Sequence, residues 1–152
     1  MDHVSFSVRR ERHPPTGEWT VLDIRINGVR LQEMVRATEI GPATAAGRPE
    51  DAGDYMGLDP RLAATRYFLG EPVTMSLRGD PIRDKVPLGC TCGEPACWPL
   101  RAELSVTDAA VTWSNFRGAN TNWDLRALGP FTFDRSEYEL ALVEAAATNR
   151  PA

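Results

Sequence analysis

The first 31 residues alternate apolar and polar side chains in three successive runs, and this pattern limits the possible folds more than any other feature. Residues 4–8 and 22–26 carry an apolar side chain at every second position, and the alternation resumes at Val29. A period of two is typical of a β-strand with one buried face. Asn27-Gly28 separates the last two runs, and both residue types tolerate the positive φ angles of a tight hairpin turn. The segment therefore predicts a three-stranded antiparallel meander.

A second antiparallel region is predicted in the last third of the chain. Residues 100–106 alternate strictly between apolar and polar side chains, and residues 107–109 have the composition of a turn. Residues 111–113 restart the alternation as the hairpin partner, and residues 131–133 predict a further short strand.

Two helices are predicted from their N-terminal signals. Asp134 precedes Glu137 by three residues, which is the spacing of a capping box. The apolar face of that C-terminal helix comprises Tyr138, Ala141, Leu142 and Ala145. A shorter helix is predicted over residues 60–69, because Asp59 can cap it and a proline suits its first position.

These elements predict an α+β fold with one domain over residues 1–152. A chain of this length, with 42% hydrophobic residues, can bury a core without disulfides or a metal. We expect an antiparallel sheet of six or seven strands, with the C-terminal helix packed on one face and the second, short helix nearby. Residues 41–54 are rich in glycine, proline and alanine and predict a flexible loop within the domain.

Charge and hydropathy exclude two classes of partner. The chain has 21 acidic and 17 basic residues and a net charge of -4, whereas proteins that bind nucleic acid usually present a basic face. No apolar run approaches the roughly 20 residues of a membrane-spanning helix, and the N-terminus lacks the pattern of a signal peptide. We therefore expect a cytoplasmic protein that binds neither nucleic acid nor a membrane.

The most unusual segment chemically is a loop with three cysteines, Cys90, Cys92 and Cys97. Thiolates are common zinc ligands, and a fourth ligand would come from elsewhere in the chain: His3, His13, Glu94 or an aspartate. Two of the cysteines can instead form a redox pair or a disulfide if their Cα atoms lie within about 7 Å. The third interpretation is that all three are buried thiols of the core. The residues leave these alternatives open, with zinc as the possible cofactor.

A second unusual segment, residues 113–124, mixes tryptophan, phenylalanine, arginine and asparagine. Flat apolar side chains with a few directional polar groups are typical of binding sites, and tryptophan and arginine often anchor protein interfaces. The alternative is an ordered loop whose tryptophans cover the edge of the core. The predicted binding surface consists of Trp98, Trp113, Asn115, Arg117, Asn122 and Trp123.

No catalytic motif is complete, so the sequence favours a protein that is not an enzyme. Only two histidines are present, and no glycine-rich phosphate loop follows a strand. The first functional hypothesis is a small immunity-like or regulatory protein that recognises a protein or small ligand through its aromatic-polar surface. The second is a zinc- or thiol-dependent protein, possibly a redox protein, centred on the three cysteines. The first hypothesis predicts that the tryptophans are exposed, and the second predicts that the three sulfur atoms lie close together.

Residues 86–142 carry a pattern of short motifs: Gly-Cys-Thr-Cys-Gly, Cys-Trp-Pro-Leu, Trp-Ser-Asn-Phe and Gly-Pro-Phe-Thr-Phe-Asp. This segment resembles a group of small bacterial proteins of unassigned function. The resemblance implies no catalytic residue and no cofactor.

Overall fold

The computed structural model describes residues 1–14, 17–74, 81–82, 85–93 and 97–148. In this part of the chain the strands are β1 (Val4–His13), β2 (Gly17–Ile26), β3 (Val29–Arg30), β4 (Val73–Thr74), β5 (Pro81–Ile82), β6 (Arg101–Val106), β7 (Ala110–Arg117) and β8 (Phe131–Asp134). The helices are α1 (Leu31–Ala45) and α2 (Arg135–Thr148), with the 3₁₀ turns η1 (Pro49–Asp51), η2 (Pro60–Ala64) and η3 (Tyr67–Leu69). This mixture of helices and antiparallel strands confirms the α+β class.

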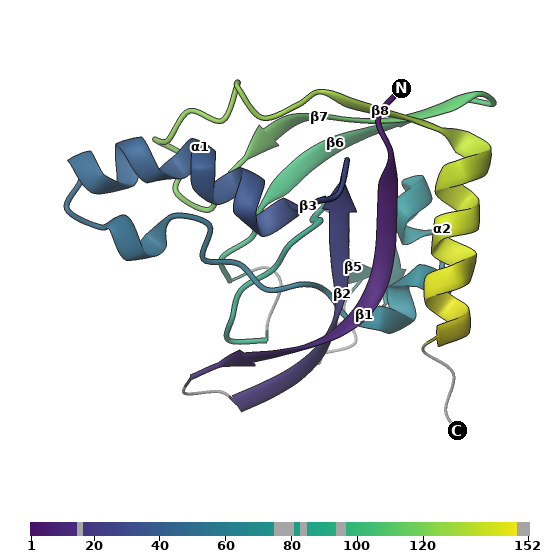
Figure 1. Cartoon of the computed structure of the whole chain (residues 1–152), viewed down its shortest axis with the longest axis horizontal. Coiled ribbons are helices and arrows are strands. Elements are labelled where there is room, and N and C mark those ends of the chain that lie inside the picture. The colour runs from purple at the N-terminus through teal and green to yellow at the C-terminus, as the bar shows by residue number, and fades with distance from the viewer. Residues whose placement is uncertain (15–16, 75–80, 83–84, 94–96, 149–152) are drawn as a thin grey trace.

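The N-terminal sheet has the predicted order β1-β2-β3 and is antiparallel throughout. Phe6 lies opposite Ile24 in the register, so apolar side chains share one face of the β1–β2 hairpin. Asn27 and Gly28 both have positive φ angles, as the predicted tight turn requires. The long hairpin runs across the direction of the other large sheet (Figure 1).

The C-terminal sheet has the order β6-β7-β8 and is separate from the first. The expected single sheet of six or seven strands is therefore wrong: the described strands form two three-stranded sheets and the small pair β4–β5. Among the described residues, one isolated parallel bridge links the two large sheets, between Asp2 and Phe133. A single bridged pair does not continue a ladder, so the sheets pack through their side chains.

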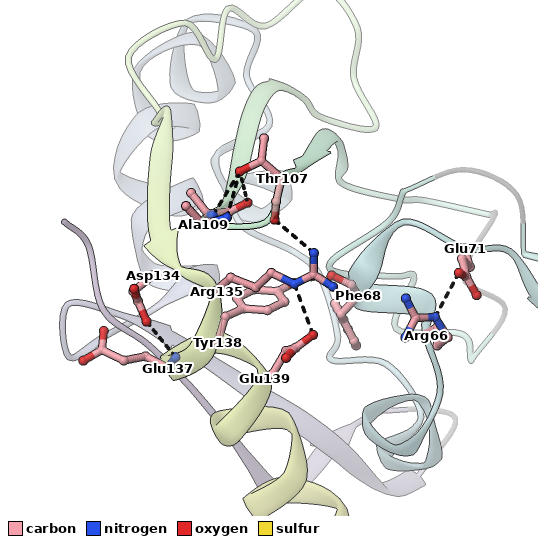
Figure 2. A network of polar contacts seen from close by, with 11 residues as sticks. Arg66, Phe68, Glu71, Thr107, Ala109, Asp134, Arg135, Glu137, Tyr138 and Glu139 are labelled. Atoms are coloured by element: carbon pink, nitrogen blue, oxygen red, sulfur yellow. Dashed lines mark hydrogen bonds and ion pairs between the residues drawn. The ribbon is translucent and has the colours of Figure 1, made fainter.

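Helix α2 packs along β1 and η2, which confirms the C-terminal helix on one face of the sheet (Figure 1). The backbone N–H of Glu137 donates to the carboxylate of Asp134 at 3.0 Å, so the predicted N-terminal cap is present. Arg135 donates to the carbonyl of Thr107 and to Glu139. The hydroxyl of Tyr138 donates to the carbonyl of Phe68 at 2.6 Å, and Figure 2 shows these contacts together.

The predicted helix over residues 60–69 is instead two short 3₁₀ turns, η2 and η3. Asp59 caps the first turn as expected, because its side chain accepts from the backbone N–H of Arg61. The chain becomes extended at Thr65, which interrupts the helix between the two turns. Tyr67 and Phe68 are buried in the second turn, so core packing determines the local structure here.

Helix α1 differs most from expectation. It extends through Gly41 and Pro42 to Ala45, so the first five residues of the expected 41–54 loop are helical. Its buried positions lie three to four residues apart along most of the helix and include Val35, Glu39 and Ala43. Pro42 lies in the last turns, where a missing N–H removes a single helical hydrogen bond.

The core lies between the two large sheets and α2. Trp113 on β7 is fully buried and has ring contacts with four aromatic side chains, at centroid separations of 5.6–6.4 Å. These four are Phe6, Phe68, Phe133 and Tyr138. The indole N–H of Trp113 donates to the hydroxyl of Tyr138 at 3.2 Å, which satisfies this polar atom inside the core.

The first residues of the chain join both sheets. Asp2 donates its backbone N–H to the carbonyl of Thr132 at 2.9 Å, and its carboxylate accepts the N–H of Thr132 at 2.9 Å. The other carboxylate oxygen of Asp2 accepts from the side chain of Asn27 at 3.0 Å. These hydrogen bonds lower the pKa of Asp2. Asp2 therefore ties the start of β1, the β2–β3 turn and β8 together.

Glu39 is a carboxyl group buried on α1 with no exposed surface. Its two oxygens accept the backbone N–H of Gly53 at 2.9 Å and the hydroxyl of Tyr55 at 3.1 Å. Burial raises the pKa of Glu39 above its ordinary value of 4.5, and these two hydrogen bonds only partly oppose that effect. The fold therefore binds the proton of Glu39 more tightly than the unfolded chain does.

This difference gives a pH-dependent prediction. The contribution of Glu39 to the free energy of unfolding is fully present below pH 4.5 and is lost as the pH rises through the raised pKa. Glu39→Gln removes the ionisable group, so the variant should gain stability relative to wild type as the pH rises through this window. Denaturant unfolding across the pH range measures this difference. Glu33→Gln, at an exposed position of the same helix, is the control and should show no such trend.

Candidate metal centre

The three cysteines lie on a loop whose two ends are held in place by backbone hydrogen bonds. Gly89 and Met56 exchange two hydrogen bonds, of 2.8 and 2.9 Å. The N–H of Leu100 donates to the carbonyl of Leu88 at 3.0 Å, which brings the end of the loop back beside its start. Cys97, near the end of the loop, therefore lies close to Cys90 at its beginning.

The three sulfur atoms converge. The Sγ atoms of Cys90, Cys92 and Cys97 all lie within 4.8 Å of one another. In a tetrahedral zinc site with Zn–S bonds of about 2.3 Å, neighbouring sulfurs are about 3.8 Å apart. The upper bound of 4.8 Å on the observed separations is compatible with this value. The cluster can therefore hold a metal ion through three thiolates.

The environment of the three thiols is not uniform. Cys90 is half-buried, whereas Cys92 and Cys97 are exposed, so the expectation that all three are core thiols is wrong. The backbone N–H of Cys92 donates to the sulfur of Cys90 at 3.4 Å. Burial, followed by the neighbouring cysteines, raises the pKa of the Cys90 thiol to about 12. In the metal-free protein Cys90 is therefore protonated at neutral pH and is a weak nucleophile.

Trp19 of β2 supports the loop from one side. Gly93 has a φ angle of 94°, in the left-handed region, and a Cβ atom there would lie 2.6 Å from the Trp19 ring. Any other residue would strain the backbone at this φ angle and displace the Trp19 ring, so only glycine fits this position. The close contact places the cysteine loop directly against the β1–β2 hairpin.

The remote residues considered as a fourth ligand do not join the sulfurs. His3 lies at the start of β1, with its Nδ1 3.6 Å from a carboxylate oxygen of Glu137. His13 lies at the far end of β1, with its Nε2 2.8 Å from Glu11. Glu94 lies outside the described residues. Among the described histidines, cysteines and acidic residues, the cluster contains only the three thiols.

The predicted aromatic-polar surface is divided by the fold. Trp113 is fully buried and Trp123 is 7% exposed, because both pack in hydrophobic clusters. Trp98 is half-buried beside the main core, and its Nε1 has no hydrogen-bond partner among the described residues. The exposed tryptophans that the first functional hypothesis requires are therefore not present at positions 113 and 123.

Three of the predicted surface residues nevertheless line one cleft. Asn115, Arg117 and Trp123 border a cavity of about 230 Å³ at the end of β7. Trp98, Trp113 and the exposed Asn122 are not part of its lining.

A buried ionic network near the hairpin could not be predicted from the sequence. Arg30 donates to Asp23 at 2.9 Å and to Glu11 at 2.6 Å, although both carboxylates are more than nine-tenths buried. Burial alone would raise the pKa of Asp23, but hydrogen bonds from Arg30 and Arg25 outweigh that effect and lower it. The alternation of β1 does not mark Glu11 as a buried position, because Phe6 and Val8 share the opposite face of the strand.

Comparison of this chain with protein-family models, with curated proteins and with solved structures finds no match. No helix in the described part of the chain is long and apolar enough to cross a membrane.

Proposed function

We propose that this chain binds zinc through Cys90, Cys92 and Cys97, with a group from solution or from a partner as the fourth ligand. The observation that supports this proposal is the mutual approach of three sulfur atoms within 4.8 Å. Thiolates are soft ligands that select zinc and similar ions over magnesium or calcium, which prefer oxygen. The proposal therefore concerns a thiophilic ion and excludes a hard cation.

A metal explains the geometry better than a disulfide does. A redox pair needs two sulfurs, and the third would then have no role in the same cluster. Here each sulfur is equally a member of the group, since every pair lies within 4.8 Å. Zinc sites with three protein ligands leave the fourth coordination position open for another ligand, and the three convergent sulfurs match that number.

The exposure of two of the cysteines supports an accessible ion. Cys92 and Cys97 face solvent, so an ion at their sulfurs is reachable by water, by a small molecule or by a side chain of another protein. Structural zinc sites usually have four protein ligands and are closed, whereas sites with three protein ligands can bind an external group. Zinc with three thiolates has a net charge of about -1, which favours exchange of a neutral or basic fourth ligand.

Metal content and thiol reactivity test the proposal together. Tag-free protein purified without chelator should contain about one zinc per chain by elemental mass spectrometry. The exposed thiols of Cys92 and Cys97 should react slowly with a thiol reagent while the ion is bound, and faster once a strong chelator removes it. A protein without metal that takes up no zinc on titration, in the reduced state, would contradict the proposal.

Cobalt substitution identifies the ligands directly. Co²⁺ replaces zinc in tetrahedral sites, and sulfur ligands produce an intense charge-transfer absorption in the near ultraviolet. The reduced protein should show this band at a stoichiometry of about one ion per chain, and zinc should displace it. A cobalt spectrum without thiolate charge transfer would place the ion elsewhere in the molecule.

A further inference from the structure

A second candidate site lies at the end of β7, away from the sulfur atoms. The cleft of about 230 Å³ has an apolar interior formed by Phe116, Trp123 and Leu125, which are all more than nine-tenths buried. Its polar rim includes Arg117, Thr121 and Arg126, all exposed. A concave apolar surface with a few polar groups at its rim is typical of a small-molecule site.

A β-bulge forms one side of this cleft. Two residues of β7, Asn115 and Phe116, lie between the positions paired with Arg101 and Glu103, whereas β6 has a single residue there. Asn115 has a φ angle of 50° and donates its side-chain N–H to Glu103 at 3.0 Å, which holds the bulge in place. Bulges change the direction of the following side chain and are common beside functional sites. The residue that follows this bulge is Arg117.

Buried side chains hold the backbone beside the cleft in place. A Cβ atom on Gly118 would lie 2.5 Å from a carboxylate oxygen of Glu39, so the chain packs directly on this buried group. The N–H of Ala119 donates to the hydroxyl of Tyr55 at 3.1 Å, and that hydroxyl donates to Glu39 at 3.1 Å. The backbone beside the cleft is therefore already ordered, which reduces the entropic cost of binding a ligand.

The charges at the rim favour an anion. The guanidinium of Arg126 is engaged with the carboxylate of Asp124, at 2.8–3.1 Å. Arg117 has no hydrogen bond or ion pair from its side chain within the described part of the chain. Arg117 is thus the cation of this cleft that is available to a ligand.

We propose that the cleft binds a small organic anion, whose apolar body contacts Phe116 and Trp123 and whose carboxylate or phosphate group binds Arg117. A guanidinium presents two parallel N–H donors to such a group, and this geometry suits both anions. The site is distinct from the cysteine cluster, since the two share no residue. Binding here does not depend on the metal.

The experiment uses two aromatic anions, benzoate and phenyl phosphate, and the neutral analogue benzyl alcohol. ¹⁵N-labelled protein is titrated with each compound while the indole N–H of Trp123 and the amides of residues 116–126 are followed by NMR. We expect saturable shifts at these positions with at least one anion, with a Kd on the order of 1 mM because the probes are small. The tighter of the two anions identifies the preferred group.

Two variants separate the role of Arg117 from a general charge effect. Arg117→Gln should weaken binding of the preferred anion at least about tenfold, because it removes a charge-assisted hydrogen bond. Arg10→Gln removes the same charge from an exposed arginine on β1 and should leave the Kd unchanged. Equal binding of benzyl alcohol, an unaltered Kd in Arg117→Gln, or the absence of saturable shifts with both anions would each overturn the proposal.

Discussion

Cys92→Ser is expected to lower the affinity for zinc by more than about a hundredfold, because loss of a direct ligand exceeds the 10- to 100-fold effect of removing an outer-shell partner. A serine hydroxyl is a poor zinc ligand at neutral pH, since it remains protonated. Cys92 is exposed, so the substitution removes no core contact and the fold should be retained. Competition with a chromophoric chelator measures the affinity, and circular dichroism checks the fold.

The matched control for this variant is Thr91→Ser, which changes the residue between two of the cysteines without removing a sulfur. It should bind zinc with an affinity close to that of wild type. Cys97→Ser should show the same loss as Cys92→Ser, because the proposal treats the exposed thiols as equivalent ligands. If one of the two serine variants binds zinc as tightly as wild type, a three-thiolate site is ruled out.

Trp113→Ala is expected to lower the free energy of unfolding by about 3–5 kcal/mol. The side chain is fully buried among four aromatic rings, so alanine leaves a large cavity in the centre of the core. It also removes the indole donor of the Tyr138 hydroxyl. Urea denaturation followed by circular dichroism measures the change from the shift of the midpoint.

Trp98→Ala provides the comparison, because Trp98 is only half-buried and its Nε1 has no partner among the described residues. We expect a clearly smaller loss of stability there than at Trp113. A loss at Trp113 of less than about 1 kcal/mol would be typical of a surface position and would contradict its place in the core.

The strands and caps could be predicted because local signals determine them. The strand over residues 22–26 and the Asn27-Gly28 turn both occur as expected in the β1–β2–β3 sheet, although Asp23 is buried along with its apolar neighbours. Asp134 and Asp59 both cap the backbone as predicted from their positions before the helical segments. These features depend on residues only a few positions apart, so one sequence is enough to identify them.

Helix α1 could not be predicted, because its buried face is not uniformly apolar. Gln32 and Glu39 occupy buried positions on this face and interrupt the hydrophobic period. Glu39 is accommodated by the N–H of Gly53 and the hydroxyl of Tyr55, which are 14 and 16 residues away. Gly41 and Pro42 also resemble a helix end, although the helix continues past them. Tertiary contacts therefore outweigh the local signals here.

The candidate site was predicted only in part. The three cysteines are evident from the sequence, but their convergence depends on the bridge between Leu88 and Leu100 and on the pairing of Gly89 with Met56. The latter contact joins residues more than thirty positions apart, which no local pattern indicates. The burial of Trp113 was implied by its alternation with Val111, yet the polar residues that follow favoured an exposed surface.

The hydrogen bonds between Asp2 and Thr132 limit the order in which parts of this protein can fold during synthesis. They join residues separated by 130 positions. During synthesis, the first strand leaves the ribosome long before residue 132 has been added, at a rate of about 5–20 residues per second. For several seconds the nascent hairpin therefore lacks its attachment to β8, and its apolar face is available to chaperones or to other chains. Attachment of the N-terminal sheet to β8 is consequently among the last events of folding.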